Sequence, residues 1–300
     1  MSTIEVSHIA KSFGATRAVE DVSFTVGRGE IFGLLGPNGA GKTTTIRILL
    51  DIFKPDSGSV ALWGGPMTEA KKDRVGYMPE ERGLYQDVPL ERCLLYLAGL
   101  KGLPQAEARR RLADQLERFD LAQHKRKKVK ELSKGMQQKA QIINTILHEP
   151  ELLIVDEPFA ALDPVNTQMI TDMFRDLRAQ GATIIMSTHQ MHHAEELCDC
   201  IVLINKGRNL LYGNLEEIRR RYVGDAVLVR PAGDLPPLAG VDSITPINHA
   251  SKLVLGKGTT PQDVLKALVA RGVVLEKFEI AIPSLDEIFI RAVSEGVPDA

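Results

Sequence analysis

The sequence predicts an α/β protein, in which helices cover a parallel or mixed sheet, followed by a small α+β domain. From residue 4 to about residue 213, short apolar runs that suit strands alternate with helical stretches. After residue 224 the composition shifts, and residues 231–237 are rich in proline and glycine, as loops are. We therefore expect a first domain over residues 1–222 and a second over residues 223–300.

Length, composition and charge bound the class of protein. Three hundred residues are about two domains' worth of chain, and 44% hydrophobic with 25% charged residues is ordinary globular usage. The formal charge of -2 argues against a protein that coats nucleic acid, so no nucleic-acid partner is expected. The three cysteines show no paired framework, which suits the reducing cytoplasm; they are Cys93, Cys198 and Cys200.

The sequence also bears on membrane association. No apolar run approaches the roughly 18 residues of a membrane-spanning helix. Residues 1–5 lack the charged and then apolar pattern of a secretion signal. Any membrane role is therefore expected to come through a partner, with this chain on the cytoplasmic side.

Three short and almost continuously apolar runs predict the central strands of the first domain. They are residues 30–35, 152–156 and 183–187. Between them, residues 90–121 repeat apolar side chains at spacings of three and four, which predicts a helix that Pro104 breaks in two. We expect this stretch to belong to a helical subdomain over about residues 85–150.

The first domain is expected to close with a hairpin and a linking helix. Two apolar runs, residues 201–204 and 209–212, flank turn-forming residues and predict the hairpin. Residues 215–222 read as a short helix that carries three consecutive arginines. We favour solvent-exposed arginines there over a site for phosphate or lipid headgroups.

The second domain has a simpler pattern of strands and helices. We expect strands at residues 252–255 and about 273–280, and helices at residues 261–270 and 284–293. Thr260 is a suitable cap for the first of these helices, and Ser284 with Glu287 three residues later forms the pattern of a capping box for the second; no solenoid-type repeat is visible.

Residues 36–43 match the pattern G-x-x-x-x-G-K-[ST] at every fixed position; they read Gly36-Pro37-Asn38-Gly39-Ala40-Gly41-Lys42-Thr43. They follow the expected strand 30–35 and precede a helical run that begins at Thr44, which is the context that the pattern requires. Glycines let backbone N–H groups converge on phosphate oxygens, Lys42 supplies a cation, and Thr43 offers a hydroxyl to Mg²⁺. A turn that only joins strand to helix would require neither side chain, so the segment predicts nucleotide binding.

A second carboxylate motif follows the expected strand 152–156. That strand ends in Asp156, at the edge of the sheet where ligands of open α/β sheets bind, and Asp156 can hold Mg²⁺ directly or through water. Glu157 points elsewhere and is placed to polarise the attacking water. By itself an Asp-Glu pair is most simply a solvated strand end, but the phosphate loop in the same chain favours the functional interpretation.

Further motifs narrow the class of phosphate-loop protein. They are Leu132-Ser133-Lys134-Gly135-Met136-Gln137-Gln138, Asp156-Glu157, Ala161-Leu162-Asp163 and His189. In this order, over about residues 1–220, they resemble the nucleotide-binding subunit of an ABC transporter. The resemblance implies a P-loop NTPase fold of ABC ATPase type, ATP hydrolysis with ATP and Mg²⁺ bound, and a head-to-tail dimer.

The resemblance also assigns roles to single residues. Ser133 and Gly135 are implied to reach the γ-phosphate of ATP that the other protomer holds, which suits a hydroxyl and an N–H at a helix start. Lys134 replaces the usual glycine and either adds a cation near the phosphate or points into solvent. Asp163 is implied to touch the opposite protomer, and His189 to contact the γ-phosphate and the attacking water.

Two more positions carry over from the resemblance. Phe13 matches the aromatic residue on which the family stacks adenine, although a lone aromatic residue is as readily part of the core. Glu80 stands where the family usually carries a glutamine that senses Mg²⁺ and the attacking water. A carboxylate still ligates a metal, but it adds a charge and donates no hydrogen bond when ionised.

Three other clusters favour ordinary explanations over functional ones. His192 and His193 are expected on a helix after His189 and exposed to solvent, because the three do not share a metal-binding helical face. Cys198-Asp199-Cys200 is too tight for a usual zinc or redox motif, so half-buried thiols are expected. The basic run over residues 125–130 is interpreted as a solvated loop rather than a site for lipid headgroups or RNA.

The second domain carries a resemblance of its own. Residues 283–290, Pro-Ser-Leu-Asp-Glu-Ile-Phe-Ile, are similar to the end of the accessory domain of exporter-type subunits in the sodium- and drug-efflux groups. We interpret the chain as the ATPase subunit of such a transporter, a homodimer or a heterodimer with a similar subunit, bound to an integral membrane permease at the cytoplasmic face. The alternatives are a non-transport ABC-type ATPase of translation or DNA repair and a regulatory module without turnover.

Overall fold

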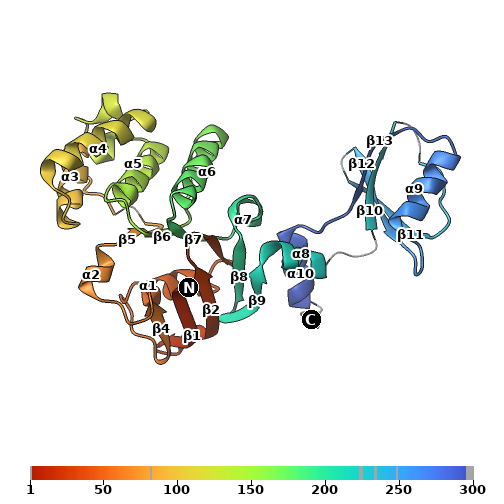
Figure 1. Ribbon diagram of the computed structural model, residues 1–300, viewed down its shortest axis with the longest axis horizontal. Coiled ribbons are helices and arrows are strands. Elements are labelled where there is room, and N and C mark those ends of the chain that lie inside the picture. Colours follow the sequence, from red (N-terminus) through yellow and green to blue (C-terminus); the bar gives the residue numbers. More distant parts are fainter. Residues whose placement is uncertain (1, 82, 223–225, 233–234, 248, 295–300) are drawn as a thin grey trace. The chain divides into compact units, whose positions relative to one another are not determined.

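The computed structural model describes all residues except 1, 82, 223–225, 233–234, 248 and 295–300. The chain divides into two compact units, residues 1–215 and 216–300 (Figure 1). The division falls at the start of the helix α8 (Leu215–Arg221), whereas the sequence places a boundary after residue 222. That later boundary stays a prediction.

A nine-stranded sheet forms the centre of the first unit. Its strands are β1 (Ser2–Phe13), β2 (Thr16–Gly27), β3 (Ile31–Leu35), β4 (Ser57–Leu62), β5 (Val75–Met78), β6 (Leu152–Asp156), β7 (Thr183–Thr188), β8 (Cys200–Asn205) and β9 (Arg208–Asn214). They lie in the order β4-β1-β2-β9-β8-β3-β7-β6-β5. The strands from β8 to β5 are parallel, whereas β4, β1 and β2 pair antiparallel, so the sheet is mixed as predicted.

The three predicted central strands are confirmed as β3, β6 and β7. Every residue in them is buried, which explains why their sequences are nearly continuous apolar runs. Leu35 pairs with Thr188, and Asp156 pairs with Ser187. Because the strands are parallel, this register brings their carboxyl ends to one edge of the sheet, where the chemistry-bearing motifs begin.

Several helices of the first unit pack against this sheet, and three helices pack on one another. The helices of the first unit are α1 (Lys42–Leu49), α2 (Glu69–Lys72), α3 (Leu90–Leu100), α4 (Gln105–Arg118), α5 (Lys134–Ile146), α6 (Pro164–Ala179) and α7 (Met191–Leu197), with single 3₁₀ turns η1 (Ala122–His124) and η2 (Val129–Glu131). Helices α3, α4 and α5 pack on one another within the predicted subdomain (Figure 1). Pro104 breaks the predicted long helix, as expected, and directly precedes α4.

The predicted hairpin and basic loop are both present. β8 and β9 pair antiparallel, with Asn205 opposite Arg208 across a two-residue turn. In the basic run the side chains of Lys125, Arg126, Lys127 and Lys128 are exposed, as expected of a solvated segment. The run directly follows η1 and contains the start of η2, so it is more ordered than a plain loop.

The second unit is a small α+β unit, as the sequence predicts. Its antiparallel sheet has the order β11-β12-β10-β13. Its elements after α8 are β10 (Ala226–Pro231), β11 (Val241–Ile247), β12 (Ala250–Leu255), α9 (Pro261–Ala270), β13 (Leu275–Ile280) and α10 (Leu285–Ser294). Val227, Leu253 and Leu268 form its core with α9 against the sheet, and Thr260 caps α9 as predicted.

The arginines of α8 differ from one another in exposure. Arg220 and Arg221 are exposed, but Arg219 is partly buried, and its Nε has no hydrogen-bond partner among the described residues. Within the described residues, none of the helices combines the length and the apolar character that crossing a bilayer requires.

Candidate functional site

The phosphate loop joins β3 to α1, and its backbone conformation explains two of its glycines. Gly36 has φ 146° and Gly41 has φ 109°, in the region that side chains with a Cβ rarely adopt. A Cβ on Gly36 would lie 2.2 Å from the carbonyl oxygen of Ile204, and one on Gly41 would lie 2.5 Å from that of Ala18. The pattern therefore requires glycine here, because the loop passes close to two other backbone segments.

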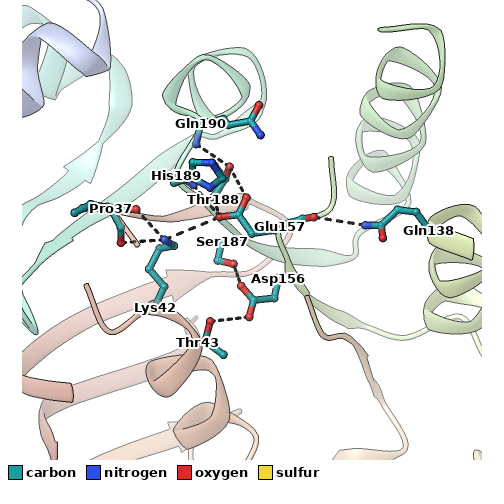
Figure 2. A network of polar contacts seen from close by, with 11 residues as sticks. Pro37, Lys42, Thr43, Gln138, Asp156, Glu157, Ser187, Thr188, His189 and Gln190 are labelled. Carbon is teal, nitrogen blue, oxygen red and sulfur yellow. Dashed lines mark hydrogen bonds and ion pairs between the residues drawn. The ribbon is translucent and has the colours of Figure 1, made fainter. Parts of the chain in front are cut away.

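Lys42 is the buried cation of the loop, with 7% of its surface exposed. Its Nζ donates hydrogen bonds to the carbonyl oxygens of Gly36 at 2.8 Å and Pro37 at 3.3 Å (Figure 2). The Glu157 carboxylate lies 4.0 Å from Nζ. Burial lowers the pKa of Lys42, and the negative charges of Glu157, Asp156 and Glu80 oppose that shift. The ammonium group of Lys42 thus lies in the electrostatic field of three carboxylates that line the same hollow.

Asp156 lies at the carboxyl end of β6 and is 1% exposed. Its Oδ2 accepts a hydrogen bond from Thr43 Oγ1 at 3.0 Å, and its Oδ1 accepts one from Ser187 Oγ (Figure 2). A hydroxyl and a carboxylate that touch are the oxygen ligands that Mg²⁺ takes beside substrate phosphates. The residues present therefore fit Mg²⁺.

A metal site made of protein side chains alone is not found in the part of the chain that the structure describes. No group of three or more histidine, cysteine, aspartate or glutamate side chains there is arranged to hold a metal ion. Mg²⁺ commonly keeps water and phosphate ligands beside one or two carboxylates. The arrangement around Asp156 therefore suits a cation that arrives with a nucleotide.

Glu157 follows β6 in a strained conformation, with φ 51° and 6% exposure. Its carboxylate accepts hydrogen bonds from the backbone N–H of His189 at 3.0 Å and from Thr188 Oγ1 at 3.2 Å. Its Oε1 also lies 2.7 Å from His189 Nδ1 (Figure 2). An ionised carboxylate accepts only, so this contact puts the proton on Nδ1. Of the three residues predicted to be catalytic, the structure brings Glu157 and His189 into direct contact, and the third, Lys42, lies 4.0 Å from Glu157.

One hollow joins most of the predicted residues and adds three that the sequence analysis missed. Its lining is Thr16, Arg17, Ala18, Asn38, Gly39, Gly41, Lys42, Thr43, Thr44, Glu80, Asp156 and Glu157. Glu80 reaches it because β5, which it follows, lies parallel to β6. Residues 16–18 begin β2 and carry no motif. They line the hollow because the chain at Ala18 passes close to Gly41 of the phosphate loop, which no sequence pattern indicates.

Phe13 lies at the end of β1 and does not line that hollow. It is 45% exposed, which rules out the core interpretation. Its ring meets that of Phe53 edge-to-face at 5.2 Å between centroids. Adenine stacking on Phe13 stays a prediction.

Ser133, Gly135 and Asp163 also lie outside the hollow. Ser133 caps α5, and its Oγ accepts a hydrogen bond from the Met136 N–H at 3.2 Å. Asp163 caps α6 in the same way through the Asn166 N–H at 2.9 Å. A Cβ on Gly135 would be 3.5 Å from the Ala161 carbonyl oxygen, so both helix starts lie near each other. Within one chain these residues are not brought to the phosphate loop.

The expectation of an exposed histidine pair is half wrong. His192 is exposed, but His193 is buried with 8% of its surface accessible. Its ring packs on Phe159 at 4.2 Å between centroids, because α7 turns it toward the interior with Ala194 and Leu197. Burial lowers the pKa of His193 to about 4. Of the two neighbouring thiols, Cys200 is half-buried as expected, but Cys198 is buried, with 8% of its surface accessible.

Comparison with known proteins identifies the family. The Bacillus subtilis (strain 168) protein YhaQ, an uncharacterized ABC transporter ATP-binding protein, is 39% identical over 293 residues, which are 97% of this chain and 98% of the relative. The chain belongs to the ABC transporter ATP-binding proteins.

Further matches cover both units of this ABC ATPase. Residues 19–160 match the family model "ABC transporter", and residues 213–293 match "ATP-binding protein DrrA1-3-like, C-terminal domain". The daunorubicin resistance ATP-binding protein DrrA3 of Streptomyces coeruleorubidus is 32% identical over 300 residues, covering 96% of this chain and 95% of that relative. A solved ATP-binding subunit of an ABC transporter superposes with a TM-score of 0.69 at 36% identity, over 74% of this chain and 93% of that structure. The predicted family and its accessory domain are confirmed.

Proposed function

We propose that this ABC ATPase subunit hydrolyses ATP within a head-to-tail dimer and thereby powers export through a separate integral membrane permease. The observation that carries the proposal is the network of Lys42, Glu157 and His189 beside the Thr43–Asp156 pair (Figure 2). It supports a site in which phosphate binding, metal binding and water activation meet. A regulatory module without turnover would require neither Glu157 nor His189 in this arrangement.

The phosphate loop binds the nucleotide in this proposal. Backbone N–H groups of the loop and the start of α1 receive the phosphate oxygens, and Lys42 turns from its own loop carbonyls to the β- and γ-phosphates. Phe13 stacks the adenine. The residues of the loop that take part are Gly36, Pro37, Asn38, Gly39, Ala40, Gly41, Lys42, Thr43 and Thr44.

Thr43, Asp156 and Glu80 hold Mg²⁺ in the proposed site. All three line the hollow, and Thr43 already touches Asp156. Bound Mg²⁺ would supply positive charge against the phosphate oxygens during transfer. Glu80 makes this donor set more acidic than a glutamine would, and so raises its attraction for a divalent cation.

Glu157 and His189 carry out the proton chemistry. Glu157 accepts a proton from the water that attacks the γ-phosphorus, and the bond from that phosphorus to the bridging oxygen of ADP breaks. The His189 Nδ1–H fixes the orientation of the Glu157 carboxylate. When protonated, the imidazole also offers Nε2–H to the charge that develops on the phosphoryl oxygens.

The second protomer completes the site. Ser133 and Gly135 lie at the exposed start of α5, outside their own chain's hollow, which supports their action on ATP held by another chain. The helix dipole and free N–H groups there favour an anion. Asp163, at the neighbouring start of α6, contacts the opposite protomer. The partner is a second copy or a similar subunit.

Export is the direction that the relatives favour. The DrrA3 relative, which matches nearly the whole chain, is named for daunorubicin resistance. The DrrA-like second unit supports the same class of transporter over an ATPase of translation or DNA repair. Such a subunit works at the cytoplasmic face of the cell membrane.

Purification from native membranes in mild detergent tests the proposal. We expect an integral membrane protein to accompany the chain, and the ATP turnover of the complex to exceed that of the chain alone. Glu157→Gln, purified in the same way, should retain the partner and lose the turnover. Recovery of the wild-type chain with ribosomes or DNA, and without any membrane protein, would contradict the proposal.

A further inference from the structure

Two buried glutamines connect α5 to the two acidic segments of the site. Gln138 and Gln141 are 6% and 3% exposed and lie three residues apart, on one face of the helix. Gln138 Nε2 donates to the carbonyl oxygen of Pro158 at 3.1 Å and to that of Glu157 at 3.5 Å, of which Figure 2 shows the second. Neither glutamine lines the hollow itself. Any effect of these side chains on chemistry therefore passes through the segments that they hold.

Gln141 holds the segment that carries Glu80. Its Nε2 donates to the carbonyl oxygen of Pro79 at 2.6 Å and to that of Glu81 at 3.3 Å. Both partners are acceptors, so only the NH₂ group of the amide can satisfy them, and its orientation is fixed by chemistry. The two bonds flank Glu80, and they therefore set where the backbone presents its carboxylate.

The Gln141 amide is only half satisfied. Its Oε1 is buried and has no hydrogen-bond partner among the described residues. A buried carbonyl without a donor is costly, and such groups in native proteins call for an explanation. An apolar side chain would leave no unpaired atom at this position, but it would also make neither of the two bonds from Nε2.

We infer that Gln141 is a positioning residue, which places Glu80 at the metal side of the site and ties that placement to the helix that begins at Ser133. Between Ser133 and Gln141 the helix runs about 12 Å, at 1.5 Å per residue. A helix moves as a rigid unit, so a shift of its first turn on contact with a phosphate reaches residues 79–81 through the two Gln141 bonds. This inference rests on the proposed role of Glu80.

The contribution of the metal to nucleotide binding measures this placement without hydrolysis. The full-length chain carries Glu157→Gln to prevent hydrolysis and Ser133→Arg to prevent pairing of two chains, and calorimetry gives its ATP affinity once in EDTA and once in excess Mg²⁺. The dissociation constant in EDTA divided by that in Mg²⁺ gives the factor by which the metal strengthens nucleotide binding. The EDTA value reports nucleotide binding without the metal.

We expect Gln141→Met to lower this ratio roughly tenfold, as loss of an outer-shell partner of a metal ligand does, and to leave the EDTA affinity unchanged. Methionine fills a similar space but donates no hydrogen bond. Glu80→Ala should lower the ratio at least as much. Adding Gln141→Met to Glu80→Ala should change nothing further, because Gln141 acts through Glu80.

Two more variants guard against a merely structural effect. Thr145→Val removes another buried polar contact of α5, the bond from Thr145 Oγ1 to the Gln141 carbonyl oxygen, and should leave the ratio as it is. Gln141→Glu keeps the length of the side chain but loses both donors when ionised, and should lower the ratio as Gln141→Met does. Gln141→Glu therefore tests the positioning role even if the Gln141→Met variant does not fold.

The outcomes separate this inference from the proposed function. If Glu80→Ala lowers the ratio and both Gln141 variants leave it unchanged, the positioning role is wrong and the metal role of Glu80 stands. If the Gln141 variants lower the ratio equally with and without Glu80, the inference is also wrong. If Glu80→Ala itself has no effect, the proposed metal role fails first, and the inference with it.

Discussion

At the scale of residues, Lys42 is the group on which we expect nucleotide binding to depend most. Its ammonium now contacts two carbonyl groups of its own loop and faces the Glu157 carboxylate. A triphosphate offers it stronger, charge-assisted partners, because phosphate oxygens carry full negative charge. The loop therefore holds the cation where a phosphate replaces weaker contacts.

Lys42→Ala should weaken ATP binding by roughly tenfold or more, since hydrogen bonds to charged groups contribute about 1.5–3 kcal/mol. Calorimetric titration of ATP checks this. Lys54→Ala is the matched control, because Lys54 is an exposed lysine that pairs with Asp51. Unchanged binding by Lys42→Ala would count against the assigned phosphate loop.

Arg17 is the charged member of the three hollow-lining residues that no motif indicates. It lines the hollow and pairs with Glu20, which also pairs with Arg208. Arg17→Ala should weaken ATP binding several-fold, more at low salt than at high salt, because an exposed cation near phosphate is screened. Arg208→Ala breaks the other half of the pair with Glu20 and should not weaken binding. Equal losses in both variants would show that only the Glu20 pairing matters.

The sequence reveals those site residues whose chemistry fixes their spacing. The phosphate loop, Asp156 and Glu157 stand beside recognisable strands, so their meeting at one sheet edge is predictable. Arg17 is not, because its place depends on how β2 passes the loop rather than on a local pattern. The contact between Gln141 and the Glu80 segment joins residues about 60 positions apart. Neither segment has a sequence pattern of its own that predicts this contact.

At the scale of elements, α7 carries a buried histidine that links pH to stability. Burial lowers the pKa of His193 to about 4, against an ordinary value of 6.5, and exposed Glu196 only partly opposes this. His148, half-buried near Lys101 and Asp73, has its pKa lowered to about 4 as well. Both groups are therefore neutral in the fold at pH 7.

The folded-state pKa values lie below those of the unfolded chain, so the stabilisation is present above pH 6.5 and is lost as pH falls toward 4. Between pH 6.5 and pH 5 each histidine should cost about 2 kcal/mol of unfolding free energy. Urea unfolding at several pH values measures this. His193→Phe keeps a ring against Phe159 and should flatten the dependence, with His148 responsible for the rest. A wild-type stability that does not change from pH 7 to pH 5 would contradict this.

Which elements could be predicted depended on their burial pattern. β3, β6 and β7 are buried on both faces and stand out as apolar runs. β1 pairs with β2 through several register shifts, which blur the alternation that marks a strand. β11 has no buried face to signal it, since six of its seven residues are exposed. The burial of His193 is unpredictable for a related reason, because only the packing of α7 decides which of two adjacent histidines is inside.

At the scale of the whole molecule, the account depends on a second chain. Within one chain the phosphate loop, Asp156 and Glu157 line a common hollow, while Ser133 and Asp163 do not reach it. Hydrolysis by one chain alone would leave the exposed start of α5 without a role. Turnover of the isolated wild-type subunit should therefore rise faster than linearly with protein concentration when the dimer is scarce.

Ser133→Arg tests the contribution of the second chain separately from nucleotide binding. The substitution places a long side chain at the start of α5, where it would obstruct a facing protomer but not its own phosphate loop. It should leave ATP affinity within a few-fold of wild type and abolish turnover. Ser133→Ala is the mild comparison, because it removes the cap at a cost of about 1 kcal/mol without adding bulk. Full turnover by Ser133→Arg would contradict the shared site.

The most direct measurement is the mass in solution of the full-length Glu157→Gln chain, by light scattering, with Mg²⁺ and either ATP or ADP. In the proposed mechanism Glu157 activates the water, so bound ATP should persist without it and hold both protomers together. The account predicts two chains per particle with ATP, one with ADP, and one with ATP when Ser133→Arg is added. A saturated ATP complex that remains a single chain, beside a wild-type chain whose turnover is strictly proportional to its concentration, would contradict it.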